Sequence, residues 1–180
     1  DGARGGRLVS PGTACVAGAQ RQVDGQVAMG MIAGAGEILI VSDGKTSAKW
    51  LAADMLSQAE HDKLATAILI TDSMEQALAV RSELERQLAA LPREEIARAS
   101  IENNGKIIVA GDLEDAVAIA NEIAPEHLEL CVDAPFDYLG KVKNAGSIFL
   151  GRYSPEPVGD YLAGTNPTLP PLCTARFSSP

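Results

Sequence analysis

Short apolar runs rich in β-branched residues alternate along this chain with longer stretches of helical periodicity, and this alternation constrains the fold more than any other feature. The apolar runs predict strands at Glu37 to Val41, Ala65 to Ile70, Ile107 to Val109, Leu128 to Val132 and Ser147 to Leu150. The stretches between them predict helices at Thr46 to Ala59, Met74 to Leu91, Arg93 to Gly105, Leu113 to Ile123 and Phe136 to Lys143. Parallel strands need crossover helices, which then cover both faces of the sheet. We therefore predict an α/β fold, with a Rossmann-like, open, mostly parallel sheet and helices on both faces.

Cap and turn signals locate the ends of these helices. Asp72 or Ser73 is the predicted N-cap of the second helix, because a short side-chain oxygen can accept from the N–H groups of the first turn. Asp112 is the predicted N-cap of the fourth helix. Pro92 and Pro125 mark the predicted exits from these two helices.

The length of 180 residues and the hydrophobic content of 46% suffice for one sizeable core. We expect a single α/β domain over residues 1–163. From Gly164 to Pro180 the chain is proline-rich and shows little periodicity, so an extended tail is expected there. The chain starts without methionine, and no helix or strand is predicted near its last residue, which indicates a segment of a larger protein.

The net charge of −9 and the pI near 4.7 argue against nucleic-acid binding, because Lys and Arg are outnumbered and form no run. Charged residues interrupt each hydrophobic segment before it reaches the roughly 20 residues that span a bilayer, so no membrane segment is predicted. Cys15, Cys131 and Cys173 are scattered and odd in number, which fits neither a disulfide framework nor a zinc knuckle. A reducing, cytoplasmic location is expected.

The chain has two histidines, and each directly follows a glutamate, in Glu60-His61 and in Glu126-His127. Histidine titrates near neutral pH and is the commonest metal ligand, so an acid–base role and a metal-binding role are open to both. We expect a site beyond the carboxyl ends of the strands, where ligands bind in open α/β sheets.

Gln58 and His61 are three positions apart, so on a helix their side chains would share one face. A carbonyl oxygen and an imidazole nitrogen could hold two positions of a zinc ion and leave others for a carboxylate and a substrate. Asp160, in the turn-rich segment after the last predicted strand, is a candidate for that carboxylate. The alternatives are structural: a histidine that complements the helix dipole and an aspartate that caps a turn.

Glu126 and His127 lie between a predicted helix and a predicted buried strand, where a rigid scaffold orients loop residues. Adjacent residues in an extended segment point in different directions, so the carboxylate and the imidazole could act on two different protons. The alternative is an exposed glutamate followed by a histidine packed at the start of the strand.

Taken in order, these segments resemble the histidinol dehydrogenase family along nearly the whole chain. The matching blocks are Ser10 to Thr13, Met31 to Glu37, Ala52 to His61, Ala124 to Leu128, Ala145 to Gly151 and Ser154 to Leu169. The resemblance places the chain in the central portion of a family member. It implies an NAD-dependent, zinc-containing homodimer that oxidises an amino alcohol, L-histidinol, to L-histidine through an aldehyde, in histidine biosynthesis.

The same resemblance assigns roles to individual residues. Gln58, His61 and Asp160 match zinc ligands that also contact the substrate, and His127 matches a further substrate contact. Glu126 and His127 match the acid–base pair. His127 would take the proton of the substrate hydroxyl, and Glu126 would activate the water that attacks the aldehyde.

Three positions depart from the family pattern. Ser10 to Thr13 replaces Gly-Pro-Gly-Asn, so that Thr13 stands where an amide contacts NAD. Gly36 replaces a substrate-binding serine, and Pro167 replaces a substrate-binding histidine. A fourth zinc ligand, also a histidine, belongs to a C-terminal region of the family outside this chain. Two alternatives therefore stay open: a relative that oxidises another polar hydroxylated substrate, such as a sulfonated diol, and a non-catalytic truncated domain.

Overall fold

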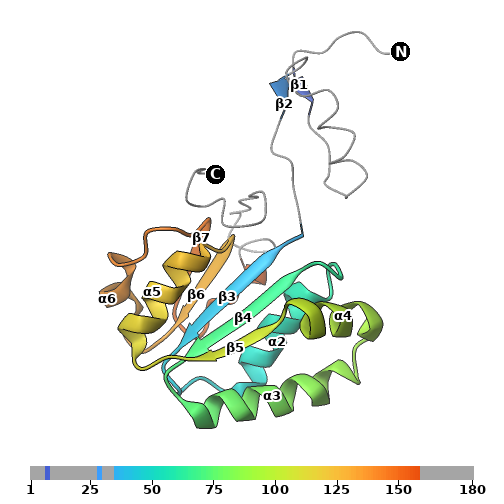
Figure 1. The fold of residues 1–180 in the computed structure, drawn as a ribbon, viewed down its shortest axis with the longest axis horizontal. Helices are drawn as coiled ribbons and strands as arrows, with labels where there is room; N and C mark the ends of the chain where they lie inside the picture. Colours follow the sequence, from blue (N-terminus) through green and yellow to red (C-terminus); the bar gives the residue numbers. More distant parts are fainter. Residues whose placement is uncertain (1–6, 9–27, 30–34, 159–180) are drawn as a thin grey trace.

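The computed structural model describes residues 35–158, together with the pairs 7–8 and 28–29. Five strands form a parallel sheet in the order β5-β4-β3-β6-β7 (Figure 1). They are β3 (Glu37–Ser42), β4 (Thr66–Thr71), β5 (Lys106–Val109), β6 (His127–Cys131) and β7 (Ser147–Leu150). Two shorter strands, β1 (Arg7–Leu8) and β2 (Ala28–Met29), pair with each other in parallel.

Helices connect the strands of the larger sheet and cover both of its faces. They are α2 (Ala48–Ala59), α3 (Met74–Leu88), α4 (Glu94–Asn104), α5 (Leu113–Ile123) and α6 (Pro135–Leu139). Side chains of α2, α3 and α4 pack with Ile38 and Ile40 on one face, whereas α5 packs with Leu39 and Val41 on the other. The predicted α/β fold is confirmed, and burial on both faces explains why β3 is apolar at consecutive positions.

The predicted helix caps are present in the structure. Ser73, rather than Asp72, is the N-cap of α3, and its hydroxyl oxygen accepts a hydrogen bond from the backbone N–H of Gln76 at 3.2 Å. The carboxylate of Asp112 accepts from the backbone N–H of Asp115 at 2.8 Å and caps α5. Each cap satisfies a donor that the first helical turn leaves without a partner.

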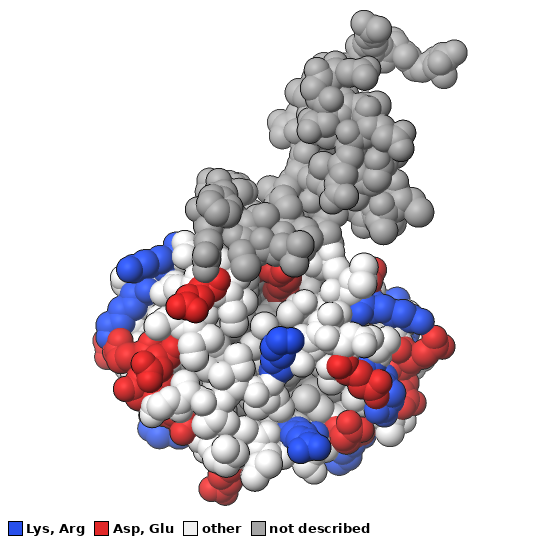
Figure 2. Space-filling model, viewed as in Figure 1, with Lys and Arg blue, Asp and Glu red and all other residues white. Residues whose placement is uncertain are grey.

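The boundary expected at residue 163 and the tail expected over residues 164–180 lie outside the described residues. No helix within residues 35–158 is long and apolar enough to cross a membrane. On the face shown in Figure 2, acidic and basic side chains lie interspersed rather than gathered into one patch of a single sign.

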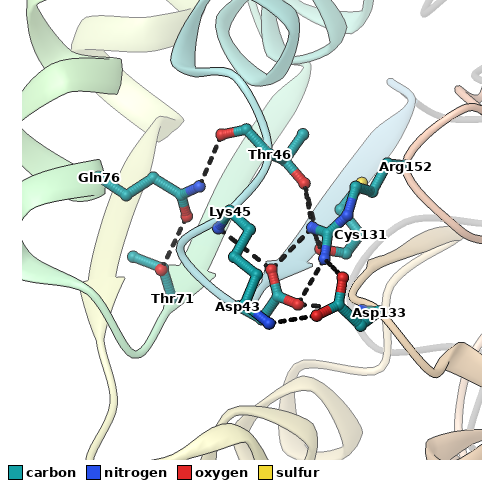
Figure 3. Close-up of polar contacts among 8 residues, drawn as sticks. All are labelled: Asp43, Lys45, Thr46, Thr71, Gln76, Cys131, Asp133 and Arg152. Atoms are coloured by element: carbon teal, nitrogen blue, oxygen red, sulfur yellow. Dashed lines mark hydrogen bonds and ion pairs between the residues drawn. The ribbon is translucent and has the colours of Figure 1, made fainter.

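An ion-pair network joins the segments that leave β3, β6 and β7 at the carboxyl edge of the sheet (Figure 3). The Arg152 guanidinium donates to the two carboxylate oxygens of Asp43 at 2.7 Å and 2.6 Å, and it also pairs with Asp133. The same group donates to the Thr46 hydroxyl at 2.7 Å and to the backbone carbonyl of Cys131 at 3.1 Å. Arg152 therefore holds three chain segments together at this edge.

The Asp43 carboxyl at the centre of this network stays ionised. Burial alone would raise its pKa, but hydrogen bonds from Arg152 and from the backbone N–H groups of Lys45 and Asp133 outweigh that effect and lower the pKa. The network is thus a charged structural element of the fold.

Candidate active site

Both Glu-His motifs lie at the amino edge of the sheet, where the strands begin. His127 is the first residue of β6 and pairs in register with Ile38 of β3 and Ser147 of β7. The last turn of α2 carries Gln58 to the same edge, because a crossover helix must return the chain from the end of one parallel strand to the start of the next. A site was expected beyond the carboxyl ends of the strands, whereas these residues lie at the opposite edge.

Gln58 is a buried amide with an unsatisfied acceptor. Gln58 is 3% exposed, and its Oε1 atom has no hydrogen-bond partner within the described part of the chain. A Cβ atom placed on Gly36 would lie 2.1 Å from Nε2 of Gln58. The amide therefore occupies the space that a side chain at position 36 would fill, and a buried carbonyl oxygen without a partner is costly unless a ligand binds it.

His61 lies outside the helix that carries Gln58. α2 ends at Ala59, and the backbone N–H of His61 donates to the carbonyl oxygen of Gln58 at 3.2 Å in a tighter turn. After the helix, the Asp62 carboxylate accepts from the backbone N–H of Leu64 at 2.8 Å and forms a turn. Gln58 is buried and His61 is exposed, so the two side chains, three positions apart, differ in their access to solvent.

Glu126 and His127 are both buried, at 7% and 8% exposure. The Glu126 carboxylate accepts from the backbone N–H of Glu37 at 3.3 Å, and Nδ1 of His127 lies 3.2 Å from the carbonyl oxygen of Glu37. The Nδ1 atom is also 3.9 Å from Oε2 of Glu126. The two side chains thus meet at one residue, so the expectation that they point in different directions is wrong, and so is the alternative of an exposed Glu126.

These contacts select one tautomer of the His127 ring. The carbonyl oxygen of Glu37 can only accept a hydrogen bond, so the proton of the neutral imidazole belongs on Nδ1. Nε2 is then the basic nitrogen of the ring.

Gln58 and the Glu126–His127 pair converge on consecutive residues at the start of β3. Gln58 lies against Gly36, and the Glu126–His127 pair contacts the backbone of Glu37. Segments that are far apart in the sequence therefore place an amide oxygen, a carboxylate and an imidazole around one point of the sheet edge. This arrangement suits metal binding next to proton transfer.

Sequence reasoning missed two further glutamates near this point, Glu129 and Glu156. Glu129 is 0% exposed on β6, and its Oε1 atom accepts from the backbone N–H of Glu156 at 2.6 Å. Oε1 of Glu156 lies 4.0 Å from Nε2 of His127. The signal for Glu129 was present in the sequence, because a glutamate between two leucines in a strand buried on both faces is rarely left without a role.

Burial controls the protonation of the acidic groups behind His127. Burial, and then the charge of Asp54, raise the pKa of Glu129 well above its ordinary value. Burial and the charge of Glu156 raise the pKa of Asp54 to about 7. Burial also raises the pKa of the neighbouring Cys131 thiol, which therefore stays protonated. Burial and the neighbouring charges therefore favour the neutral form of Glu129.

Three residues predicted at the site lie outside the described residues: Thr13, Asp160 and Pro167. Within residues 35–158, no group of three or more His, Cys, Asp or Glu side chains is arranged to hold a metal ion. The candidate zinc ligands that the structure does describe are Gln58 and His61.

Comparison with known proteins identifies the family of this chain. A family model described as histidinol dehydrogenase matches residues 4–180. The chain belongs to the histidinol dehydrogenase family. Histidinol dehydrogenase of Bacillus cereus is 58% identical over 97% of the chain, and that of Geobacter metallireducens is 56% identical over the same share. The chain spans 41% and 40% of the lengths of these two relatives.

The fold agrees with a solved member of the family. The crystal structure of histidinol dehydrogenase from Elizabethkingia anophelis matches with a TM-score of 0.92 and 36% sequence identity. The match covers 98% of this chain and 41% of that one. Such similarity over almost the whole chain supports the parallel arrangement of the strands that positions the candidate site.

Proposed function

We propose that this chain forms the acid–base and zinc-binding segment of a histidinol dehydrogenase, which oxidises L-histidinol to L-histidine with NAD as the electron acceptor in histidine biosynthesis. One observation carries the proposal: the buried Glu126–His127 pair and the Gln58 amide meet at Gly36 and Glu37. The proposal extends to a cytoplasmic homodimer, as family membership suggests. A sulfonated diol is not favoured as substrate, because the relatives at 52–58% identity are named histidinol dehydrogenases.

His127 is the proposed base for the alcohol. Its Nδ1 proton is held by the carbonyl oxygen of Glu37, which orients the ring and makes Nε2 the atom that takes the hydroxyl proton. Orientation by a backbone carbonyl also keeps the ring in one tautomer through both oxidation steps. Thr13, the residue assigned to NAD contact, lies outside the described residues. NAD, when bound, accepts the hydride of each oxidation.

Glu126 is the proposed base for water in the second oxidation. Its carboxylate is 7% exposed and is held by the backbone N–H of Glu37 at 3.3 Å. The group can take a proton from the water that adds to the aldehyde, and a positioned base of this kind contributes about 10²–10⁴-fold to a rate.

The proposed zinc ligands are Gln58, His61 and Asp160. The unsatisfied, buried Oε1 of Gln58 fits this role, because a cation would supply the partner that the described residues do not. The exposed His61 follows three positions later. Zinc, when bound, would polarise the oxygen of the substrate.

The test is steady-state and single-turnover kinetics of Glu126→Gln in a full-length version that carries the flanking regions of the relatives. Glutamine keeps an oxygen for the N–H of Glu37 but cannot take a proton. We expect the aldehyde-to-acid step to slow by about 10²–10⁴-fold and the alcohol-to-aldehyde step to slow much less. Glu114→Gln, which removes an exposed carboxylate on α5, is the matched control and should leave both steps unchanged. An equal loss in both steps, together with lower thermal stability, would assign Glu126 a structural role.

A further inference from the structure

One face of β6 carries a line of polar side chains. His127, Glu129 and Cys131 alternate along the strand with Leu128 and Leu130, which belong to the core under α5. Cys131 packs with the core under α2, so the polar line faces that side of the sheet. Glu129 stands between the two other polar residues and is 0% exposed.

The segment after β7 crosses this polar line and is anchored twice. Arg152 attaches its first part to Asp43 at the carboxyl edge. Four residues later, the backbone N–H of Glu156 donates to Oε1 of Glu129 at 2.6 Å. A segment that starts at the carboxyl edge is thereby directed back towards His127, at the amino edge.

The second anchor places the Glu156 carboxylate beside the catalytic ring. Oε1 of Glu156 is 4.0 Å from Nε2 of His127, on the side of the ring away from the Nδ1 contact with Glu37. The distance is too long for a hydrogen bond but short enough for a strong charge interaction once the ring carries a proton. Glu156 is only 5% exposed, so water screens this interaction little.

We propose that Glu156 is a positioning residue that stabilises the protonated ring of His127, and that Glu129 holds Glu156 in place through its backbone N–H. The assignment of a base role to His127 rests on the proposed function, whereas the positioning itself does not. The ring faces Glu126 on its own segment, Glu156 from the segment after β7, the carbonyl oxygen of Glu37 from β3, and the uncharged Phe149 ring from β7.

The raised pKa of Glu129 supports this division of roles. Burial and the charge of Asp54 raise the pKa of Glu129, and the charge of Glu156 raises the pKa of both Asp54 and Glu129, so these charges disfavour ionisation of Glu129. Because burial favours the protonated form of Glu129, Glu156 is the carboxyl group that can carry the charge facing the ring.

The two histidines of the chain allow a direct test by NMR. In the complete 180-residue chain, labelled with ¹⁵N-histidine and kept with a chelator, the ring nitrogens report the tautomer and the titration midpoint of each residue. His61→Gln assigns the two sets of signals. We expect wild-type His127 to carry its neutral proton on Nδ1.

Charge removal should then separate the two glutamates. Glu156→Gln should lower the His127 midpoint by on the order of one pH unit and leave the His61 midpoint unchanged. Glu129→Gln keeps an oxygen acceptor for the N–H of Glu156 and should preserve the His127 midpoint, whereas Glu129→Leu removes the acceptor and should lower it. Glu95→Gln on α4 is the control for net charge, because that glutamate is exposed and pairs with Lys63.

The proposal is overturned if Glu156→Gln moves the His127 midpoint no more than Glu95→Gln does. If Glu129→Leu does not fold, the comparison of Glu156→Gln with Glu129→Gln still decides the question. Kinetics of the full-length version keep the two proposals apart. A shifted NMR midpoint without any histidinol oxidation would refute the proposed function and leave the positioning role standing.

Discussion

Replacing Arg152 by alanine tests whether the network at the carboxyl edge stabilises the fold. The side chains of Arg152 and Asp43 are 14% and 8% exposed, so the substitution leaves a buried carboxylate without its counter-ion. Removal of one partner from a buried ion pair costs about 3–5 kcal/mol. We expect a value near 3 kcal/mol, at the lower end of this range. The reason is that the backbone N–H groups of Lys45 and Asp133 still donate to Asp43.

Urea denaturation at neutral pH, followed by circular dichroism, measures this change as a lower free energy of unfolding. Arg152→Lys should recover part of the loss, because lysine keeps the charge but not the two-pronged geometry of the guanidinium. Arg86→Ala removes an exposed arginine that pairs with Glu83 and should leave the free energy of unfolding unchanged.

The pH dependence has a defined sign. The pKa of Asp43 is lowered in the folded chain, so its stabilising contribution is present above the pKa of the unfolded carboxyl and is lost as the pH falls through the folded pKa. The difference between wild type and Arg152→Ala should therefore narrow below a pH of about 4. A loss of less than about 1 kcal/mol at neutral pH would refute the reasoning, because it would show that Asp43 does not depend on the buried pair.

Three further substitutions test the candidate site and its surroundings. The pKa of Asp54 is raised to about 7 in the folded chain, so this carboxyl group destabilises the fold increasingly as the pH rises towards 7. Asp54→Asn removes the group. The free energy of unfolding of Asp54→Asn, minus that of the wild type, should therefore grow as the pH rises towards 7 and stay constant above it. Gly36→Ala should displace the Gln58 amide, and a chelator competition should show zinc binding weakened several-fold. The free energy of unfolding should change by about 1 kcal/mol or less, because the end of the flexible Gln58 side chain can move. His61→Ala should lower the zinc content of dialysed protein measured by elemental analysis; equal metal content would remove His61 from the ligand set.

The sequence alone predicted the five strands of the larger sheet, the helices between them and the caps of α3 and α5, although α6 is shorter than predicted and β1 and β2 were not predicted. The apolar run at β3 and the serine and aspartate caps of α3 and α5 depend on steric preferences and hydrogen bonds within a few residues, so their patterns can be read locally. The sequence also indicated the two Glu-His motifs as candidates for acid–base or metal-binding roles, because these roles follow from residue type and spacing.

The edge at which Gln58 meets the Glu126–His127 pair was decided by tertiary structure. The neighbours of β3 in the sheet are β4 and β6, and the pairing with β6 joins Ile38 to His127, which lie far apart in the sequence. That pairing sets both the burial of Glu126 and the approach of His127 to Glu37.

Glu129 and Glu156 show most clearly what the sequence alone could not predict. Their roles depend on one hydrogen bond between a strand and the segment that follows the next strand, at 2.6 Å. The sequence around Glu156 gives no sign that it is buried, and the apolar strand around Glu129 indicates burial of Glu129 but not its partner. Only the packed fold, which removes water from around them, raises the pKa of Glu129 and brings Glu156 to the ring of His127.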